Sequence, residues 1–425
     1  MKMNFEELLK PMTCPCGRVH QSSVKKIVME RGALDRLTDV IGSLGDYRHI
    51  VMICDRNTYR AAGEAAETLI RPESTIILDP AGLHADEHGV GAVAEKLPEE
   101  ADLLIAVGSG TVHDITRFTA HKHGIPFVSV PTAASVDGYV ANVAAMTWKG
   151  VKKTFPACAP IAMVADIDVI ANAPMRLTAS GVGDMLGKYT ALTDWKVAHL
   201  LTGEYLCERI VSLVEQALDQ VRDSVERLAD RDPEAVYSLM CGLVFSGVAM
   251  QLSGNSRPAS GAEHHVSHFI EMTVPADVCG ALHGEKVGVG LLMVSDAYRR
   301  FAALSDREAL GILNGYRSAD EEKIRNWFGG LADEILQDNR IDCAQGITAD
   351  TFAAALPGIR AVIGEKIPTA DALNRLLEAV GACRTLEDIG LHSADRNYYL
   401  SHAPLARNRL TLMRLISGDL SALGD

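Results

Sequence analysis

From residue 26 to about residue 170, short uninterrupted apolar runs alternate with amphipathic stretches, and this alternation limits the possible folds most. Four apolar runs predict strands, at residues 49–54, 74–78, 101–107 and 126–130. The amphipathic stretch at residues 112–123 predicts a helix between the last two strands. Strands that are apolar throughout have both faces covered, which is typical of a parallel sheet between layers of helices. We therefore predict an α/β domain.

The pattern changes at about residue 171, after which strand-like runs are few and helical periodicity dominates. It is clearest at residues 204–228 and 234–252. A chain of 425 residues with 48% hydrophobic residues has enough apolar material for two cores. We therefore predict an α/β domain over residues 1–170, followed by an all-helical domain over residues 171–425.

Composition excludes several classes of protein. A formal net charge of −14 argues against a nucleic-acid-binding surface, which needs a concentrated positive field. No uninterrupted apolar run approaches the ~20 residues that span a bilayer. The N-terminus carries Glu6 and Glu7 and lacks the apolar core of a signal peptide. The nine cysteines are scattered and odd in number, as expected for reduced thiols in a cytoplasmic protein.

A glycine-containing loop follows the third predicted strand, with the sequence Gly108-Ser109-Gly110-Thr111-Val112. Glycine lets the backbone approach an anion closely, and the next helix offers unpaired amide groups at its positive end. The loop therefore predicts a pyrophosphate cradle in a Rossmann-like domain. Taken alone, it is equally consistent with an ordinary tight turn.

Two further strand ends offer polar groups to a dinucleotide. Asp55 ends the first predicted strand, where a carboxylate can accept hydrogen bonds from a ribose diol; the neighbouring Arg56 leaves NADP open beside NAD. Thr132-Ala133-Ala134-Ser135 follow the fourth strand and offer hydroxyl groups to a cofactor. Asp137 can face substrate hydroxyls. The alternative is that these residues only cap and close turns.

Asp184, His264 and His283 form the main metal-binding candidate in the helical region. One carboxylate and two imidazoles commonly hold a catalytic divalent ion while leaving positions open for substrate. His268 lies four residues after His264, so the two rings share a helix face.

Cys14, Cys16 and His20 form a second, N-terminal cluster of possible ligands. It offers only three ligands and lacks the second cysteine pair of a zinc knuckle. Its role stays open at this point.

Taken together, these motifs resemble the sn-glycerol-1-phosphate dehydrogenases, in particular their bacterial branch. The motifs that carry the resemblance are Gly108-Ser109-Gly110-Thr111, Pro131-Thr132-Ala133-Ala134-Ser135-x-Asp137-Gly138, Gly181-x-Gly183-Asp184, Arg257-Pro258-Ala259-Ser260-Gly261-x-Glu263-His264-x3-His268 and His283-Gly284-Glu285. The superfamily includes glycerol dehydrogenase, iron-dependent alcohol dehydrogenase and 3-dehydroquinate synthase. The resemblance covers residues 26–300 clearly and the C-terminal helices loosely.

The resemblance implies a dehydroquinate synthase-like fold and a reversible, NAD- or NADP-dependent reduction of dihydroxyacetone phosphate to sn-glycerol 1-phosphate, a phospholipid precursor. It implies one divalent metal ion, zinc or nickel, and a homodimer. The residues that match metal ligands are Asp184, His264 and His283; those that match substrate contacts are Asp137, Asp184 and His268; those that match cofactor contacts are Asp55, Gly108, Ser109, Gly110, Thr111, Val112, Thr132, Ala133, Ala134 and Ser135. Ala141 stands where archaeal relatives carry a cofactor-contacting serine.

A phosphorylated substrate needs cationic donors, for which Arg257, Lys153 and Lys188 are candidates. We favour Arg257, because a guanidinium grips phosphate with two parallel bonds; an ion-pair role for Arg257 is the alternative. We expect His268 to take part in a proton relay beside metal-bound water. The competing hypotheses are a glycerol or polyol dehydrogenase that acts on a non-phosphorylated substrate, a 3-dehydroquinate synthase, and a nucleotide- or metal-binding regulator without activity.

Overall fold

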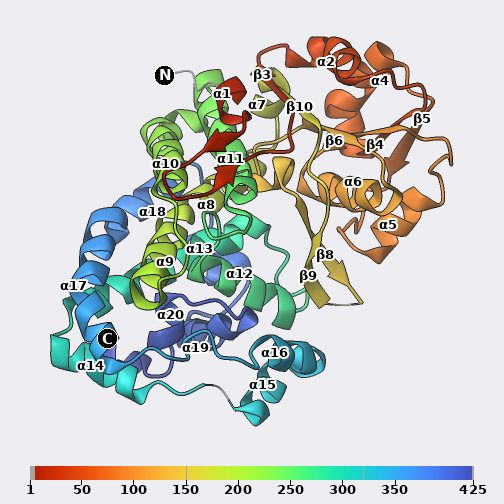
Figure 1. Cartoon of the computed structure of the whole chain (residues 1–425). Coiled ribbons are helices and arrows are strands. Elements are labelled where there is room, and N and C mark those ends of the chain that lie inside the picture. The colour runs from red at the N-terminus through yellow and green to blue at the C-terminus, as the bar shows by residue number, and fades with distance from the viewer. Residues whose placement is uncertain (1–4, 150, 319, 424–425) are drawn as a thin grey trace. The chain divides into compact units, whose positions relative to one another are not determined.

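The computed structural model describes residues 5–149, 151–318 and 320–423. The chain folds into two compact units: Met1–Gly181 with Leu213–Asn255, and Val182–Ser212 with Ser256–Asp425. In Figure 1 the red-to-yellow part of the chain carries the strands, and the green-to-blue part is helical. The secondary structure changes from strands to helices close to residue 171, as predicted. That residue 171 also separates two domains stays a prediction.

The first unit is built on a six-stranded sheet whose order is β3-β10-β7-β6-β4-β5, and all its strand pairs are parallel. The four predicted strands are β4 (Ile50–Asp55), β5 (Ser74–Leu78), β6 (Leu103–Gly108) and β7 (Phe127–Pro131). The two remaining strands are β3 (Lys26–Glu30) and β10 (Ala162–Asp166). The prediction of a parallel α/β sheet is confirmed.

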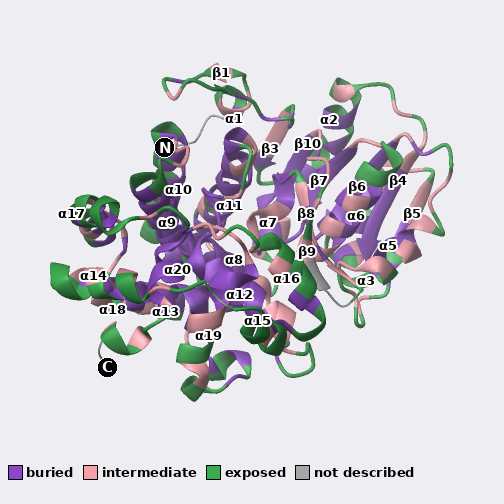
Figure 2. Ribbon diagram, turned by 60° about the horizontal axis from the view of Figure 1, so that its bottom comes forward, coloured by how far each residue is buried: buried purple, intermediate pink, exposed green. Residues whose placement is uncertain are grey.

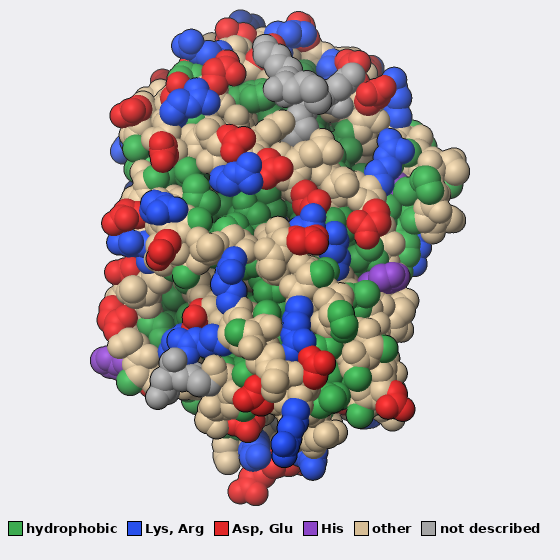
Figure 3. Space-filling model, turned by 90° about the vertical axis from the view of Figure 1, so that its left-hand side faces the viewer, with side chains coloured by type: hydrophobic (Ala, Val, Ile, Leu, Met, Phe, Trp, Pro, Cys, Tyr) green, Lys and Arg blue, Asp and Glu red, His purple; other side chains and the backbone are tan. Residues whose placement is uncertain are grey.

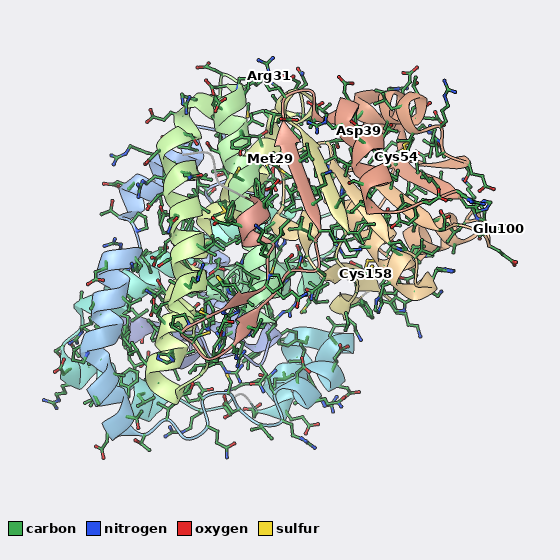
Figure 4. The ribbon with its side chains drawn as sticks, turned by 45° about the horizontal axis from the view of Figure 1, so that its top comes forward. Met29, Arg31, Asp39, Cys54, Glu100 and Cys158 are labelled. Carbon is green, nitrogen blue, oxygen red and sulfur yellow. The ribbon has the colours of Figure 1, made fainter. Side chains whose placement is uncertain are left out.

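Apolar side chains project from both faces of this sheet, as the apolar strands predict. On β4, Met52 and Cys54 belong to one buried cluster, and Val51 and Ile53 belong to the other. Figure 2 shows the central strands in the buried colour, and Figure 4 labels Cys54 among them. The helices that contribute to the two clusters are α2 (Leu37–Leu44) and α4 (Glu64–Ile70) on one side, and α5 (Glu87–Ala94) and α6 (Gly110–His123) on the other.

Two antiparallel hairpins accompany the sheet: β1 (Met12–Thr13) with β2 (Val19–His20), and β8 (Val143–Trp148) with β9 (Val151–Pro156). The first unit also contains the short helices α1 (Phe5–Leu8), α3 (Arg56–Thr58) and α7 (Ile167–Ala171).

Helix α11 (Pro233–Ser253) is the one helix, among the residues described, that is long and apolar enough to cross a membrane. Of its most apolar window, 78% is buried inside the structure, which is the behaviour of a core helix. The Sγ atom of Cys241 on this helix lies 3.7 Å from the Sδ atom of Met29 on β3, and Figure 4 labels Met29.

The described chain after Asp166 contains helices and no strand, which confirms the predicted all-helical C-terminal region. The helices that follow α7 are α8 (Met175–Leu186), α9 (Lys188–Thr202), α10 (Glu208–Leu228), α11, α12 (Ala262–Thr273), α13 (His283–Ala303), α14 (Asp306–Gly315), α15 (Glu321–Phe328), α16 (Ala332–Asp338), α17 (Ala349–Lys366), α18 (Ala370–Glu378), α19 (Arg396–His402) and α20 (Leu412–Ile416). Acidic and basic side chains are interspersed on the face in Figure 3, so the excess of acidic groups forms no single patch there.

Candidate metal centre and dinucleotide site

Three helices of the second unit bring the predicted metal ligands together. Asp184 lies near the end of α8, His264 lies in the first turn of α12, and His283 begins α13. One ligand atom from each of the three residues lies within 4.8 Å of the others. Asp184 and His264 are buried, whereas the His283 side chain is 29% exposed. The cluster is therefore enclosed on the Asp184 side and accessible at His283.

Glycines allow these helices to approach so closely. A Cβ atom at Gly183, next to Asp184, would overlap the carbonyl oxygen of Gly284, next to His283. A Cβ atom at Gly290 would lie only 2.7 Å from the carbonyl oxygen of Glu263, next to His264. Since any side chain at these positions would separate the backbones, the glycines determine how near the three ligands can come.

The imidazole of His264 is oriented by Glu263. Its Nδ1 donates to Glu263 Oε1 at 2.7 Å, and the same carboxylate accepts from Thr190 Oγ1 at 2.5 Å and from the Gly261 amide at 2.7 Å. The other ring nitrogen, Nε2, lies 3.5 Å from Asp184 Oδ1. A carboxylate behind the ring is the usual support of a metal-binding histidine.

Lys188 holds the carboxylate of Asp184, with 2.6 Å between Nζ and Oδ1 in a fully buried pair. Burial alone would raise the pKa of Asp184, but the charge of Lys188 and the hydrogen bond from His264 hold that pKa below its usual range. Asp184 is thus ionised, as a metal ligand must be. Lys188, a candidate phosphate donor in the sequence, instead orients this carboxylate.

Glu271 is a site residue that the sequence reasoning missed. Its carboxylate lies 3.4 Å from His268 Nδ1, 3.3 Å from His283 Nδ1 and 2.9 Å from Lys286 Nζ. The signal was present, because Glu271 follows His264 and His268 at helical spacings of seven and three residues. Burial lowers the pKa of His268 to about 3, and its ring centroid lies 6.2 Å from that of His264 and 5.8 Å from that of His283.

Arg257 forms the ion pair that was the alternative to phosphate binding. Its Nε donates to Glu204 Oε1 at 2.6 Å, a second nitrogen contacts the other oxygen of that carboxylate, and Nη1 donates to the Leu410 carbonyl at 2.6 Å. The Arg257 guanidinium therefore makes its two parallel hydrogen bonds to the Glu204 carboxylate, the arrangement that was expected for a phosphate. A role of Arg257 in substrate binding stays a prediction.

Arg407 is a second cation, besides Lys286, whose charge acts on the groups around Glu271. Burial lowers the pKa of its guanidinium, and the charges of Asp338 and Glu271 oppose that shift. Burial is the largest cause of the lowered pKa of His268, and the positive charge of Arg407 lowers that pKa further. Its neighbour Arg409 is held by Ser260 and Ser256, at 3.1 and 2.9 Å. Arg407 could not be predicted from the sequence, because it lies far along the chain from α12 and belongs to no motif.

In the first unit, the predicted cofactor segments end adjacent strands. Gly108 pairs with Pro131, and the register of Ile53 with Ala106 places Asp55 beside Gly108. The chain passes from β4 outward to β5 on one side, and from β6 outward to β7 on the other. Asp55 and Gly108 therefore lie at the point where the strand order reverses, which is where open α/β sheets bind ligands.

The glycine loop leads directly into α6. A Cβ atom at Gly108 would lie 2.6 Å from Cβ of Val112, whose side chain is fully buried, so Val112 can offer only its backbone. Ser109 precedes the helix and Gly110 begins it, with Thr111 next. Their amide groups form the free end of α6, the usual place for a phosphate.

The second cofactor segment packs against this loop. The Thr132 amide donates to the Gly108 carbonyl at 3.0 Å, and the Ser135 hydroxyl lies 2.9 Å from that of Tyr139. Ala133 and Ala134 are buried. Ala141 is buried as well and presents a methyl group where a serine would present a hydroxyl.

Two predicted carboxylates, Asp55 and Asp137, accept hydrogen bonds within the first unit. Asp55 accepts from the amides of Asn57 and Thr58, at 2.7 and 2.9 Å, and so caps α3. Asp137 Oδ2 accepts from the Ser246 hydroxyl at 2.7 Å. Asp55 therefore matches the alternative of local capping, whereas Asp137 is bonded to α11, far along the chain. Their contacts with cofactor and substrate stay predictions.

Comparison with known proteins identifies the relatives of this chain. Residues 28–174 match the family model for iron-containing alcohol dehydrogenase. The glycerol-1-phosphate dehydrogenase [NAD(P)+] of Halalkalibacterium halodurans is 32% identical over 96% of this chain and 96% of its own length. The enzyme of that name from Bacillus licheniformis is 38% identical over 74% of this chain and 82% of its own length.

A solved structure shows the same fold at low identity. The crystal structure of a probable glycerol dehydrogenase from Sinorhizobium meliloti 1021 matches 94% of this chain and 96% of its own, with a TM-score of 0.63 and 17% identity. With this fold, these motifs and two relatives above 30% identity, the chain belongs to the family of NAD(P)+-linked glycerol-1-phosphate dehydrogenases.

Proposed function

We propose that this protein catalyses the reversible, NAD(P)-dependent reduction of dihydroxyacetone phosphate to sn-glycerol 1-phosphate with the help of one divalent metal ion. The observation that carries the proposal is the convergence of Asp184, His264 and His283 in a chain of this family. The names of the relatives supply the substrate class. The residues of the chain supply the chemistry, as follows.

Asp184, His264 and His283 would hold the metal ion. The donor set fits zinc or nickel, because it combines one ionised carboxylate with two imidazoles and leaves the His283 side accessible. When bound, such an ion supplies Lewis-acid polarisation of a ketone oxygen. Glu263 orients His264, and Lys188 orients Asp184, so both ligands are pre-positioned by buried partners.

The amides at the start of α6 would hold the dinucleotide pyrophosphate, with Asp55 beside them for the adenosine ribose. The hydride chemistry belongs to the nicotinamide, and the chain's task is to present the substrate to it.

His268 would bind a substrate hydroxyl. With Nδ1 donating to Glu271, its Nε2 is left as an acceptor, which suits the hydrogen bond from a hydroxyl group. The relay role predicted for His268 from the sequence stays a prediction, because burial holds the pKa of this imidazole at about 3. Asp137 would be a second acceptor for substrate hydroxyls.

For the phosphate we propose Arg407 in preference to Arg257. Arg257 makes to Glu204 the two bonds that a phosphate would need, and the charge of Arg407 acts on His268 and Glu271. A guanidinium partly removed from water binds a phosphate more strongly than an exposed one does.

We further propose that the chain is a cytoplasmic homodimer and that its product enters phospholipid synthesis. These assignments rest on the resemblance to the bacterial branch of the family. Gel filtration with light scattering tests the dimer directly.

The first experiment replaces a metal ligand. His283→Ala should reduce bound metal to a small fraction and lower turnover of dihydroxyacetone phosphate by ~10³-fold, since Lewis-acid stabilisation of the transition state contributes several kcal/mol. Metal content by mass spectrometry and NADH oxidation measure both quantities on one sample. His392→Ala, a histidine outside the cluster, is the matched control. Full turnover by metal-free His283→Ala protein would refute the mechanism.

The second experiment separates phosphorylated from free substrate. Arg407→Ala should raise KM for dihydroxyacetone phosphate ~10- to 100-fold, as expected for a lost hydrogen bond to a charged group, and should leave dihydroxyacetone unaffected. Arg257→Ala should affect both substrates alike, through stability. If the wild-type protein prefers dihydroxyacetone itself, the polyol dehydrogenase hypothesis replaces the present one. A chiral assay of the product decides its configuration.

A further inference from the structure

We propose that Cys14, Cys16 and His20 bind a zinc ion at a second site, structural in role and separate from Asp184, His264 and His283. All three residues belong to the N-terminal hairpin of the first unit. The hairpin has no part in the proposed reaction, so its ligand-type residues need another explanation.

The fold of the hairpin gathers the three side chains. Strands β1 and β2 pair in antiparallel register, with Met12 opposite His20. At the tip, the Gly17 amide donates to the Cys14 carbonyl at 3.0 Å, and the Cys14 amide donates to the Arg18 carbonyl at 3.0 Å. Gly17 has φ of 85°, a conformation that favours glycine and closes the turn. Cys14 and Cys16 therefore lie at the turn, with His20 on the returning strand.

The ligand atoms have the spacing of a metal site. One atom from each residue lies within 4.8 Å of the others, and Cys16 Sγ is 3.3 Å from His20 Nε2. Zinc bonds of about 2.3 Å to sulfur and about 2.0 Å to nitrogen, at a tetrahedral angle, separate those two atoms by about 3.5 Å. Replacement of the thiol proton by a zinc ion thus needs almost no movement of these two atoms.

His20 has the tautomer that a zinc ligand needs. Its Nδ1 donates to the Leu252 carbonyl in the last turn of α11, at 2.7 Å, so the lone pair of Nε2 is directed at Cys16. A backbone carbonyl behind a histidine ring is the common support of metal-bound histidines. His20 is 1% exposed and Cys14 is 5% exposed, so the site is removed from water on the side of the core.

The site has a structural use within the first unit. The N-terminal segment is also attached to the end of α11 by Gln251, whose side-chain oxygen accepts from Ser22 Oγ at 3.1 Å and from the Ser23 amide at 3.0 Å. A zinc ion on the hairpin would fix His20, and through Leu252 it would fix the last turn of α11. Two thiolates, an imidazole and a fourth ligand make the closed coordination typical of structural zinc.

Neither Cys14 nor Cys16 forms a disulfide, so both sulfurs can serve as thiolates. Soft thiolate ligands select zinc over the hard cations that carboxylates prefer. The donor set therefore differs from that of Asp184, His264 and His283, and the two sites can be distinguished by their ligands.

The test uses the full-length protein purified in reducing buffer with zinc and then dialysed. We expect about two metal ions per chain, and the Cys14→Ser/Cys16→Ser protein should lose about one of them while it keeps the ion at His283. His283→Ala should show the opposite loss. Cys383→Ser, at a partly exposed cysteine of the second unit, should keep both ions.

A measurement on the wild-type protein covers the case in which the double variant does not fold. X-ray absorption at the zinc edge should show sulfur neighbours at about 2.3 Å, since the ligands at Asp184, His264 and His283 include no sulfur. Serine replacement of each other cysteine then identifies a fourth sulfur ligand, if there is one. A zinc spectrum with nitrogen and oxygen neighbours only, or full metal content in the folded double variant, would overturn the proposal. Neither the metal content nor the X-ray absorption spectrum depends on turnover. The hypothesis of a zinc site on the hairpin can therefore be tested even if the proposed reaction is wrong.

Discussion

At the scale of single residues, the buried His113 fixes the glycine loop at residues 108–112, which is the predicted pyrophosphate site, by a hydrogen bond to its backbone. His113 lies fully buried in α6, where Nδ1 donates to the Ser109 carbonyl at 3.0 Å and Nε2 accepts from the Ser129 hydroxyl at 2.8 Å. Both nitrogens are used in the neutral form, and burial lowers the pKa of His113 to about 3. The neighbouring charge of Arg117 acts in the same direction. The imidazole is therefore neutral in the folded chain, and a proton on it would create a desolvated charge beside Arg117.

This arrangement predicts a loss of stability in acid. Because the pKa of His113 is about 3 in the folded chain and near 6.5 when exposed, the unfolded state binds more protons between those values. The stability contribution is complete above pH 6.5 and falls by ~1.4 kcal/mol per pH unit below it. His113→Gln should remove this part of the slope, so its deficit against wild type should shrink by ~2 kcal/mol between pH 6.5 and pH 5. Urea unfolding at both pH values measures it, and parallel stability curves would contradict it. Because His265 and His268 also have lowered pKa values, only the difference between variant and wild type isolates His113.

At the scale of elements, the sequence predicted four strands of the sheet and missed β3 and β10. The strands β4 to β7 were predicted because apolar residues dominate each of them. In β3, only the three residues between Lys26 and Glu30 are apolar, which is too short a run to stand out. In β10, small alanines and the final Asp166 weaken a strand that is buried throughout.

The candidate site follows the same logic. Asp184, His264 and His283 were predicted together because each belongs to a local motif whose glycines let the helices approach. The pairing of Arg257 with Glu204 and the position of Arg407 were not predictable, because tertiary contacts between distant segments determine them. A local pattern shows that a side chain can bind an ion or a phosphate, and the packing of the elements decides which partner it meets.

At the scale of the whole molecule, the residues proposed for the two ligands belong to different units. The dinucleotide residues lie in the first unit, at the ends of β4, β6 and β7, and the metal ligands lie in the second. A ligand stabilises the elements that hold it, by ~2.7 kcal/mol at a concentration one hundred times its Kd, which slows exchange of amides that open with those elements by ~100-fold. The units should therefore respond to the two ligands separately.

Hydrogen exchange of the metal-free protein tests this separation. Addition of zinc should protect peptides from α12 and α13 most, whereas NADH alone should protect the peptide from β6 into α6 and residues 131–141 most. His283→Ala should abolish the first response and leave the second intact, because no dinucleotide residue is changed. If NADH protected α12 and α13 more than the start of α6, the dinucleotide would bind in the helical unit, and the assignment of Gly108 to Val112 would be wrong. The order of the two protections thus tests the cofactor site and the metal site independently, without any measurement of turnover.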